Sequence, residues 1–221
     1  EFASEYYKED FLNYNDRFGT EGMEFGKLVP SLWMPDYLQN ELGYTTHARV
    51  SLPVLNSKTN INRGFDSFKL MDKHNDMAAM LPTLHFDTER PSFHLLNVGE
   101  THYPFVKPDE DPSNWPRISG VHGVFKHLDK QVVGGKLVSD AEAPKFFDQE
   151  KLDKLREMQI DTVRYLDQEV FPKLYDMVPD NTWITVTADH GELFGEQGYF
   201  GHGPIMHEKV FEVPFMEGRI R

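Results

Sequence analysis

The stretch Trp183-Ile-Thr-Val-Thr-Ala-Asp-His-Gly-Glu192 decides the fold. Its first five residues are apolar or β-branched, which is typical of a buried strand. A strand that ends at Asp189 and His190 would present a carboxylate and an imidazole at the carboxyl edge of a sheet, where open α/β sheets bind their ligands. Gly191 then allows the backbone to turn sharply. The stretch therefore predicts an α/β fold with a polar site at the end of this strand.

Asp189 and His190 are the first candidates for metal ligands. A carboxylate beside an imidazole suits a divalent cation, and Ca, Mn, Zn and Mg all stay open. Neighbouring side chains of an extended backbone point to opposite sides, so the two can share one cation only if the chain turns between them. His202 follows after a short excursion, flanked by two glycines, and is a candidate for a third polar group.

The segments before this stretch predict further elements of an α/β fold. Residues 31–43 are expected to form a short helix that is closed by a C-terminal glycine, and residues 44–50 a strand. Pro91-Ser-Phe-His-Leu-Leu-Asn-Val98 is a second apolar strand, and a polar loop that contains His102 follows it. We expect His94, inside this strand, to pack rather than to bind a ligand.

A long helix is expected directly before the strand that ends at Asp189. Apolar residues recur at steps of three and four positions from Leu152 to Met177, apart from one longer step before Val163, and Pro172 should kink or divide the helix. A helix followed by such a strand is the order found in crossover units of largely parallel sheets. We therefore expect a single α/β domain over residues 1–221. Its parts are an opening segment with an amphipathic helix (1–30), helix and strand units (31–105), an irregular excursion (106–148), and a helix, metal strand and closing strand (149–217).

The composition excludes several classes of partner. The net charge of −13 argues against nucleic acids and anionic membranes, which would repel the chain. The sequence has no apolar run long enough to span a bilayer. Because it contains no cysteine, it forms no disulfide, and the cellular compartment cannot be inferred from it.

The longer string TVTADHGELFGEQGYFGHGPIMHEKVFEVPF, residues 185–215, resembles the carboxyl-terminal metal segment of the sulfatase family in the alkaline phosphatase superfamily. In that family a Thr-x-Asp-His/Asn-Gly-Glu strand end precedes a Gly-Glu-x-Gly stretch, a Gly-His/Lys element and a Val-Pro strand. The helix at 31–43, the strand after it and Gly-Phe-Asp at 64–66 also look like the middle of that family. The resemblance implies a three-layer α/β sandwich with a largely parallel or mixed sheet, alkaline-phosphatase-like.

The resemblance also implies roles for four residues. Asp189 and His190 match metal ligands of the family. His202 matches the residue that contacts the sulfate or phosphate group or protonates the leaving oxygen. His102, in Thr-His-Tyr-Pro, matches a histidine that reaches the anionic ester. For His202 the alternative is a loop residue without function, and for His102 a histidine that packs a strand end.

Glu192 follows the two expected ligands directly and has two interpretations. It is either a hydrogen-bond acceptor that orients His190 or an acidic residue at the start of a helix. We favour the helix start.

The sequence lacks the nucleophile of a sulfatase. It has no cysteine and no Ser-x-Pro-x-Arg motif, and Ser51-Leu-Pro-Val-Leu55 lacks the arginine. The family's Asp-Asp pair at the end of its first strand is also missing from this sequence. The resemblance therefore covers about residues 31–217 and corresponds to the later part of a catalytic domain, without the nucleophile segment. We do not expect turnover by this chain alone, because catalysis in the family needs that nucleophile.

Three functions follow from these observations. The first is a sulfatase-like, metal-dependent hydrolase that acts, when complete, on small anionic sulfate or phosphate esters. The second is a phosphoesterase or phosphotransferase of the same superfamily, which Asp-His in place of Asp-Asn favours. The third is a non-catalytic, truncated relative that binds an anion or a partner chain, including a second copy in a homo-oligomer.

Overall fold

The computed structural model describes residues 33–57, 60–62, 64–87, 89–116, 118, 132–133, 136–137, 148–203 and 205–221. The chain divides into two compact units. The first contains residues 1–74 and 79–99, and the second contains residues 75–78 and 100–221. The amphipathic helix expected within residues 1–30 lies outside the described residues.

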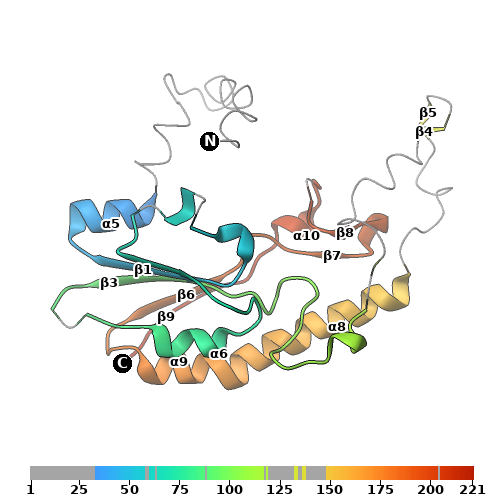
Figure 1. Cartoon of the computed structure of the whole chain (residues 1–221). Helices are drawn as coiled ribbons and strands as arrows, with labels where there is room; N and C mark the ends of the chain where they lie inside the picture. The colour runs from blue at the N-terminus through green and yellow to red at the C-terminus, as the bar shows by residue number, and fades with distance from the viewer. Residues whose placement is uncertain are drawn as a thin grey trace. The chain divides into compact units, whose positions relative to one another are not determined.

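The first unit is built on a parallel sheet with the strand order β2-β1-β3. The strands span Thr45–Val50 (β1), Ser67–Leu70 (β2) and Ser92–Asn97 (β3). β1 is the central strand and is almost entirely buried, and Ala48 and Val50 are fully buried. The parallel pairing confirms the expected strands near 44–50 and 91–98 and the mixed α/β class (Figure 1).

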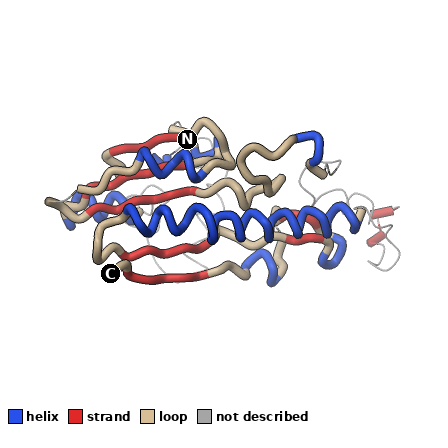
Figure 2. Tube along the Cα trace, turned by 90° about the horizontal axis from the view of Figure 1, so that it is seen from below, coloured by secondary structure: helices blue, strands red, loops and turns tan. Residues whose placement is uncertain are grey.

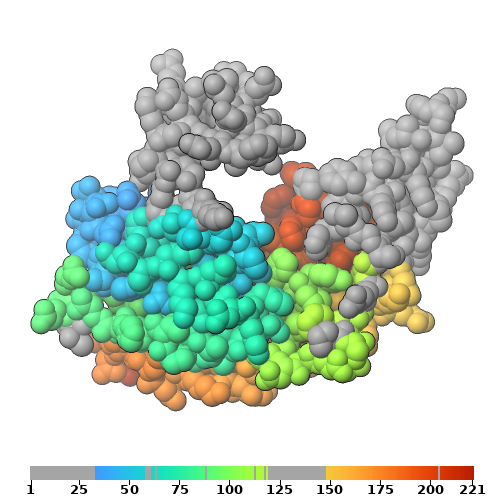
Figure 3. All heavy atoms as spheres, viewed as in Figure 1, coloured from blue at the N-terminus to red at the C-terminus, as the bar shows by residue number. Residues whose placement is uncertain are grey.

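The helix α5, Met34–Leu42, packs against β1 in the same unit (Figure 1). It starts with Pro35 in its first turn and ends at Gly43, whose φ of 70° is left-handed. The amide of Tyr44 donates to the carbonyl of Leu38, which is the hydrogen bond expected of a glycine-terminated helix. The expected helix with its glycine C-cap is confirmed. In the space-filling view, the atoms of this unit form a continuous surface on the side that faces the viewer (Figure 3).

Polar side chains run across the middle of this sheet. His47 in β1 lies opposite Ser67 in β2 and His94 in β3. The two imidazole rings stack at a centroid distance of 4.8 Å, and Phe86 packs on His94 at the same distance. Both ring nitrogens of His94 are buried, and neither has a hydrogen-bond partner among the described residues. His94 therefore packs, as expected, and the fold favours its neutral form.

We expect the chain to lose stability as the pH falls below about 6.5. Burial, reinforced by the charges of His47 and Arg49, lowers the pKa of His94 to about 4. The unfolded chain takes up a proton near pH 6.5, while the folded chain does not until about pH 4, so the free energy of unfolding falls between these values. We estimate the loss at about 1–2 kcal/mol because the ring is only partly shielded from solvent. Urea unfolding at pH 7 and pH 4.5 measures it.

His94→Phe is the control for this prediction, because it keeps the aromatic contact with Phe86 and removes the titrating group. The variant should lose less stability than the wild type over the same pH interval. An equal loss in both proteins would mean that His94 is not the group responsible.

The second unit contains a long helical segment that precedes the strand Trp183–Thr187. It comprises α8 (Gln149–Tyr165), the π-helical η5 (Leu166–Val170) and α9 (Phe171–Met177), which form one continuous run (Figure 2). Asp148 caps α8, because its carboxylate accepts a hydrogen bond from the amide of Glu150. Pro172 lies in the first turn of α9, directly after the π-helical η5, so the helix is irregular near this proline, but it is not divided there.

The strand β6, Trp183–Thr187, pairs with β9, Phe215–Arg219, in an antiparallel arrangement (Figure 2). Both strands were expected, but the expectation that β6 is buried is wrong. Its side chains alternate between exposed and half-buried, and Trp183 is 66% exposed. Phe215 of β9 is also exposed. Association with a second copy of the chain stays a prediction.

A small hairpin follows β6. It comprises β7 (Leu193–Phe194), the 3₁₀ turn η6 (Glu196–Gly198) and β8 (Phe200–Gly201). One hydrophobic core joins this hairpin to α8, and a second joins it to the helix α10, Glu208–Phe211. The first core contains Phe105, Leu152, Leu155, Phe194 and Phe200. The second contains Leu193, Ile205 and Val210. The hairpin is therefore held from two sides.

The remaining elements are short. They are η1 (Pro53–Leu55), η2 (Asn60–Asn62), α6 (Met77–Met80), η3 (Leu81–Thr83), η4 (Pro112–Asn114), β4 (Val132–Val133) and β5 (Lys136–Leu137). β4 and β5 form an antiparallel pair inside the expected irregular excursion 106–148, most of which lies outside the described residues. Within the described part of the chain, no helix has the length and apolar character needed to cross a bilayer.

Candidate metal centre

The β7–β8 hairpin brings Glu192 and His202 together. Its register pairs Leu193 with Gly201 and Phe194 with Phe200, so the next pair outward along both strands is Glu192 and His202. The Nδ1 atom of His202 lies 3.2 Å from Oε2 and 3.4 Å from Oε1 of Glu192. Gly201 has a φ of 87°, a left-handed value that turns the chain just before His202.

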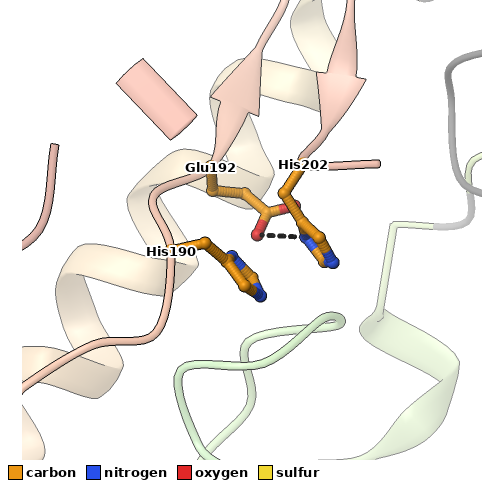
Figure 4. Close-up of side chains that lie close together, drawn as sticks. All are labelled: His190, Glu192 and His202. Atoms are coloured by element: carbon orange, nitrogen blue, oxygen red, sulfur yellow. Dashed lines mark hydrogen bonds and ion pairs between the residues drawn. The ribbon is translucent and has the colours of Figure 1, made fainter. Parts of the chain in front are cut away.

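His190 lies beside this pair. Its ring stacks on that of His202 with centroids 3.6 Å apart, and Figure 4 shows the two imidazoles side by side below Glu192. Among the described residues, His190, Glu192 and His202 form a group whose potential ligand atoms all lie within 4.8 Å of one another. The carboxylate of this group is already hydrogen-bonded to Nδ1 of His202, so the group offers two imidazoles to a cation.

Asp189 supplies a second carboxylate at the edge of this group. Its Oδ1 atom lies 3.6 Å from Nε2 of His190. Two ligand atoms of one tetrahedral zinc ion are about 3.4 Å apart, so the two side chains are already spaced to share a cation. The chain therefore turns between Asp189 and His190, as it must if these adjacent side chains are to bind one cation. The carboxylate of Asp189 is 85% exposed, and no described group other than His190 forms an ion pair with it.

Gly191 is needed for close packing rather than for an unusual backbone angle. A Cβ atom at this position would lie 1.9 Å from the carbonyl oxygen of Lys209 and 2.8 Å from that of Glu212. The amide of Gly191 donates to the carbonyl of Val210 at 2.8 Å. Gly191 is not among the glycines with positive φ. The glycine instead lets α10 fix the backbone between His190 and Glu192.

His102 reaches the same region from the loop at residues 100–105. Tyr103 packs edge-on against Phe200 of the hairpin, and Phe105 packs against Phe194. These contacts fix the loop to the two strands that carry Glu192 and His202. The Nδ1 atom of His102 lies 2.9 Å from the carbonyl oxygen of Tyr103.

The electrostatics of the site favour a neutral imidazole at His202. Burial lowers the pKa of His202, and the neighbouring His190 and His102 lower it further, while Asp189 opposes them. The neutral ring is the form that binds metals. The other three residues selected from the sequence therefore lie close enough to His202 to shift its pKa. They are Asp189, His190 and His102.

Glu192 is the residue that sequence reasoning assigned wrongly. No helix starts there, because β7 follows directly, and its carboxylate contacts His202. The sequence held a usable signal: the apolar pairs Leu193-Phe194 and Phe200-Gly201 flank a glycine-rich turn and predict a hairpin. Extending that hairpin by one residue pair would have placed Glu192 opposite His202.

Comparisons with known proteins do not add a relative. No family model matches the chain, and no match was found among curated proteins or solved structures.

Proposed function

We propose that this chain carries the metal site of a sulfatase-like, metal-dependent hydrolase of sulfate or phosphate esters. The observation that carries the proposal is the 3.6 Å spacing of Asp189 and His190, next to the stacked ring of His202. These residues come from the segment that resembles the sulfatase family. The proposal includes the three-layer, alkaline-phosphatase-like architecture, which the parallel β2-β1-β3 sheet and the flanking helix are compatible with.

The residues present fit a divalent cation of borderline hardness. Imidazole and carboxylate together suit Zn²⁺ or Mn²⁺ better than Ca²⁺ or Mg²⁺, which prefer oxygen ligands alone. Asp189, His190 and His202 would hold the cation, and a bound cation would supply positive charge to the anionic ester. His102, on the adjacent loop, would contact the ester oxygens and orient them.

The leaving oxygen also needs a proton donor. His202 would have no nitrogen left for this step, because its Nδ1 lies next to Glu192 and its Nε2 would hold the cation. Of the two histidines selected from the sequence for this role, His102 would then be the proton donor. The reaction further needs a nucleophile, and no Cys/Ser-x-Pro-x-Arg motif occurs in the sequence.

Turnover and binding assays on the zinc- or manganese-loaded chain test the proposal. We expect inorganic sulfate or phosphate to bind only when the metal is present. Hydrolysis of aryl sulfates would favour the sulfatase hypothesis, and hydrolysis of aryl phosphates would favour the phosphoesterase hypothesis. Metal-dependent anion binding without turnover would place this chain with the non-catalytic relatives. Anion binding that is equal with and without metal would contradict the proposed site.

A further inference from the structure

In three histidines of the candidate centre, Nδ1 lies within hydrogen-bonding distance of an oxygen atom. Nδ1 of His102 lies 2.9 Å from the carbonyl oxygen of Tyr103, and Nδ1 of His190 lies 3.0 Å from that of Gly191. Nδ1 of His202 lies 3.2 Å from the carboxylate of Glu192. Carbonyl and carboxylate oxygens only accept hydrogen bonds, so each Nδ1 must be the donor and must carry the proton. In a neutral ring, Nε2 is then left with its lone pair.

His202 differs from the other two histidines because its acceptor is a side chain. The acceptors of His102 and His190 are carbonyls of the next residue along the chain, which no substitution removes. Glu192 lies ten positions before His202 and meets it only through the hairpin register. Its side chain is only 12% exposed, so water offers little competition for the hydrogen bond. The two rings stack in Figure 4 with their outer nitrogens on the same side, away from Glu192.

We propose that Glu192 is a positioning residue that accepts the Nδ1 hydrogen bond of His202 and thereby keeps Nε2 of this ring free to bind. Metal-binding histidines commonly donate their second N–H to a carboxylate or a carbonyl, which fixes the tautomer and the ring orientation. Glu192 acts through His202 and is not itself a ligand. The hydrogen bond and the tautomer do not depend on the proposed function. Only the expected effect of Glu192 on metal affinity rests on it.

The direct test is the tautomer of His202 in metal-free protein, read from two-bond ¹H–¹⁵N correlation spectra of ¹⁵N-histidine-labelled chain. In the wild type we expect the Nδ1–H tautomer at all three histidines. In Glu192→Ala, His202 should shift towards the Nε2–H tautomer, while His102 and His190 keep theirs. In Glu192→Gln the amide oxygen can still accept the hydrogen bond, so the wild-type tautomer should return. An Nε2–H signal for His202 in the wild type would overturn the proposal.

Zinc titration by calorimetry separates positioning from ligation. We expect Glu192→Ala to weaken zinc binding about 10- to 100-fold, the usual cost of removing a partner of a metal-binding histidine, and Glu192→Gln to weaken it less than Glu192→Ala. Glu157→Gln, at an exposed position on α8, is the matched control and should bind like the wild type. A loss in Glu192→Gln as large as that in Asp189→Asn would make Glu192 a ligand and refute the positioning role. If no variant, including the wild type, binds zinc, the proposed function fails while the tautomer result still stands.

Discussion

Replacing Asp189 with asparagine should weaken zinc binding at least about 100-fold and leave the fold unchanged. Removing a partner of a ligand already costs about 10- to 100-fold, and removing a ligand should cost more. The amide keeps the size of the carboxylate but removes its charge. Because the side chain is 85% exposed and its only ion pair within the described part of the chain is with His190, no buried group there loses a charged partner. Calorimetric titration with zinc, alongside urea unfolding, measures both parts of this prediction.

Asp180→Asn is the matched control for this change. Asp180 is an exposed carboxylate in the turn before β6, so its replacement removes the same charge from the same unit. If zinc binding depends on the ligand geometry, Asp180→Asn should bind zinc as the wild type does. Equal losses in the two variants would mean that the net negative charge attracts the cation, and the assignment of Asp189 as a ligand would be wrong.

Replacing Gly191 with alanine should destabilise the chain by about 2–4 kcal/mol, which lowers Tm by roughly 5–15 °C. The new methyl group would lie 1.9 Å from the carbonyl oxygen of Lys209, so α10 or the backbone at residue 191 must move. The hydrogen bond from Gly191 to Val210 would lengthen as a result. The same movement displaces His190 and Glu192, so zinc affinity should fall as well.

Gly218→Ala provides the comparison for Gly191→Ala. Gly218 lies in β9, and a Cβ atom there would meet nothing within 4 Å. Its φ is not positive, so alanine fits the strand. Thermal unfolding should show little change or a small gain for Gly218→Ala. A similar fall in Tm for both variants would show that loss of glycine, and not contact with α10, causes the effect.

Local signals in the sequence predicted the elements that short-range chemistry specifies. Gly43 closes α5 because glycine adopts the left-handed conformation without strain, and this is visible in a single residue. The long helix is irregular near Pro172 for an equally local reason, since proline lacks the amide proton that a helix interior needs. The apolar runs that became β1 and β3 were also clear. β2 was not predicted, because its four residues include a lysine and only the pairing with β1 defines it.

The exposure of β6 and the role of Glu192 depend on contacts that the sequence does not display. A run of β-branched residues is equally compatible with a buried and a half-exposed strand, and the neighbours of the strand decide between them. Glu192 gains its role from the register of the hairpin, which brings it to His202 across a turn. Asp189 and His190 were expected to lie together because they are adjacent in the chain, but their 3.6 Å spacing needed the structure.

X-ray absorption spectroscopy at the zinc edge of the zinc-loaded chain tests the central claim most directly. One zinc ion per chain should show the scattering of two imidazole rings and a carboxylate oxygen, with ligand distances of about 2.0–2.1 Å. The ligands would be Asp189, His190 and His202, so the imidazole contribution should fall by half in His202→Ala. A first shell without imidazole scattering, or a spectrum that His202→Ala leaves unchanged, would contradict the proposed metal centre.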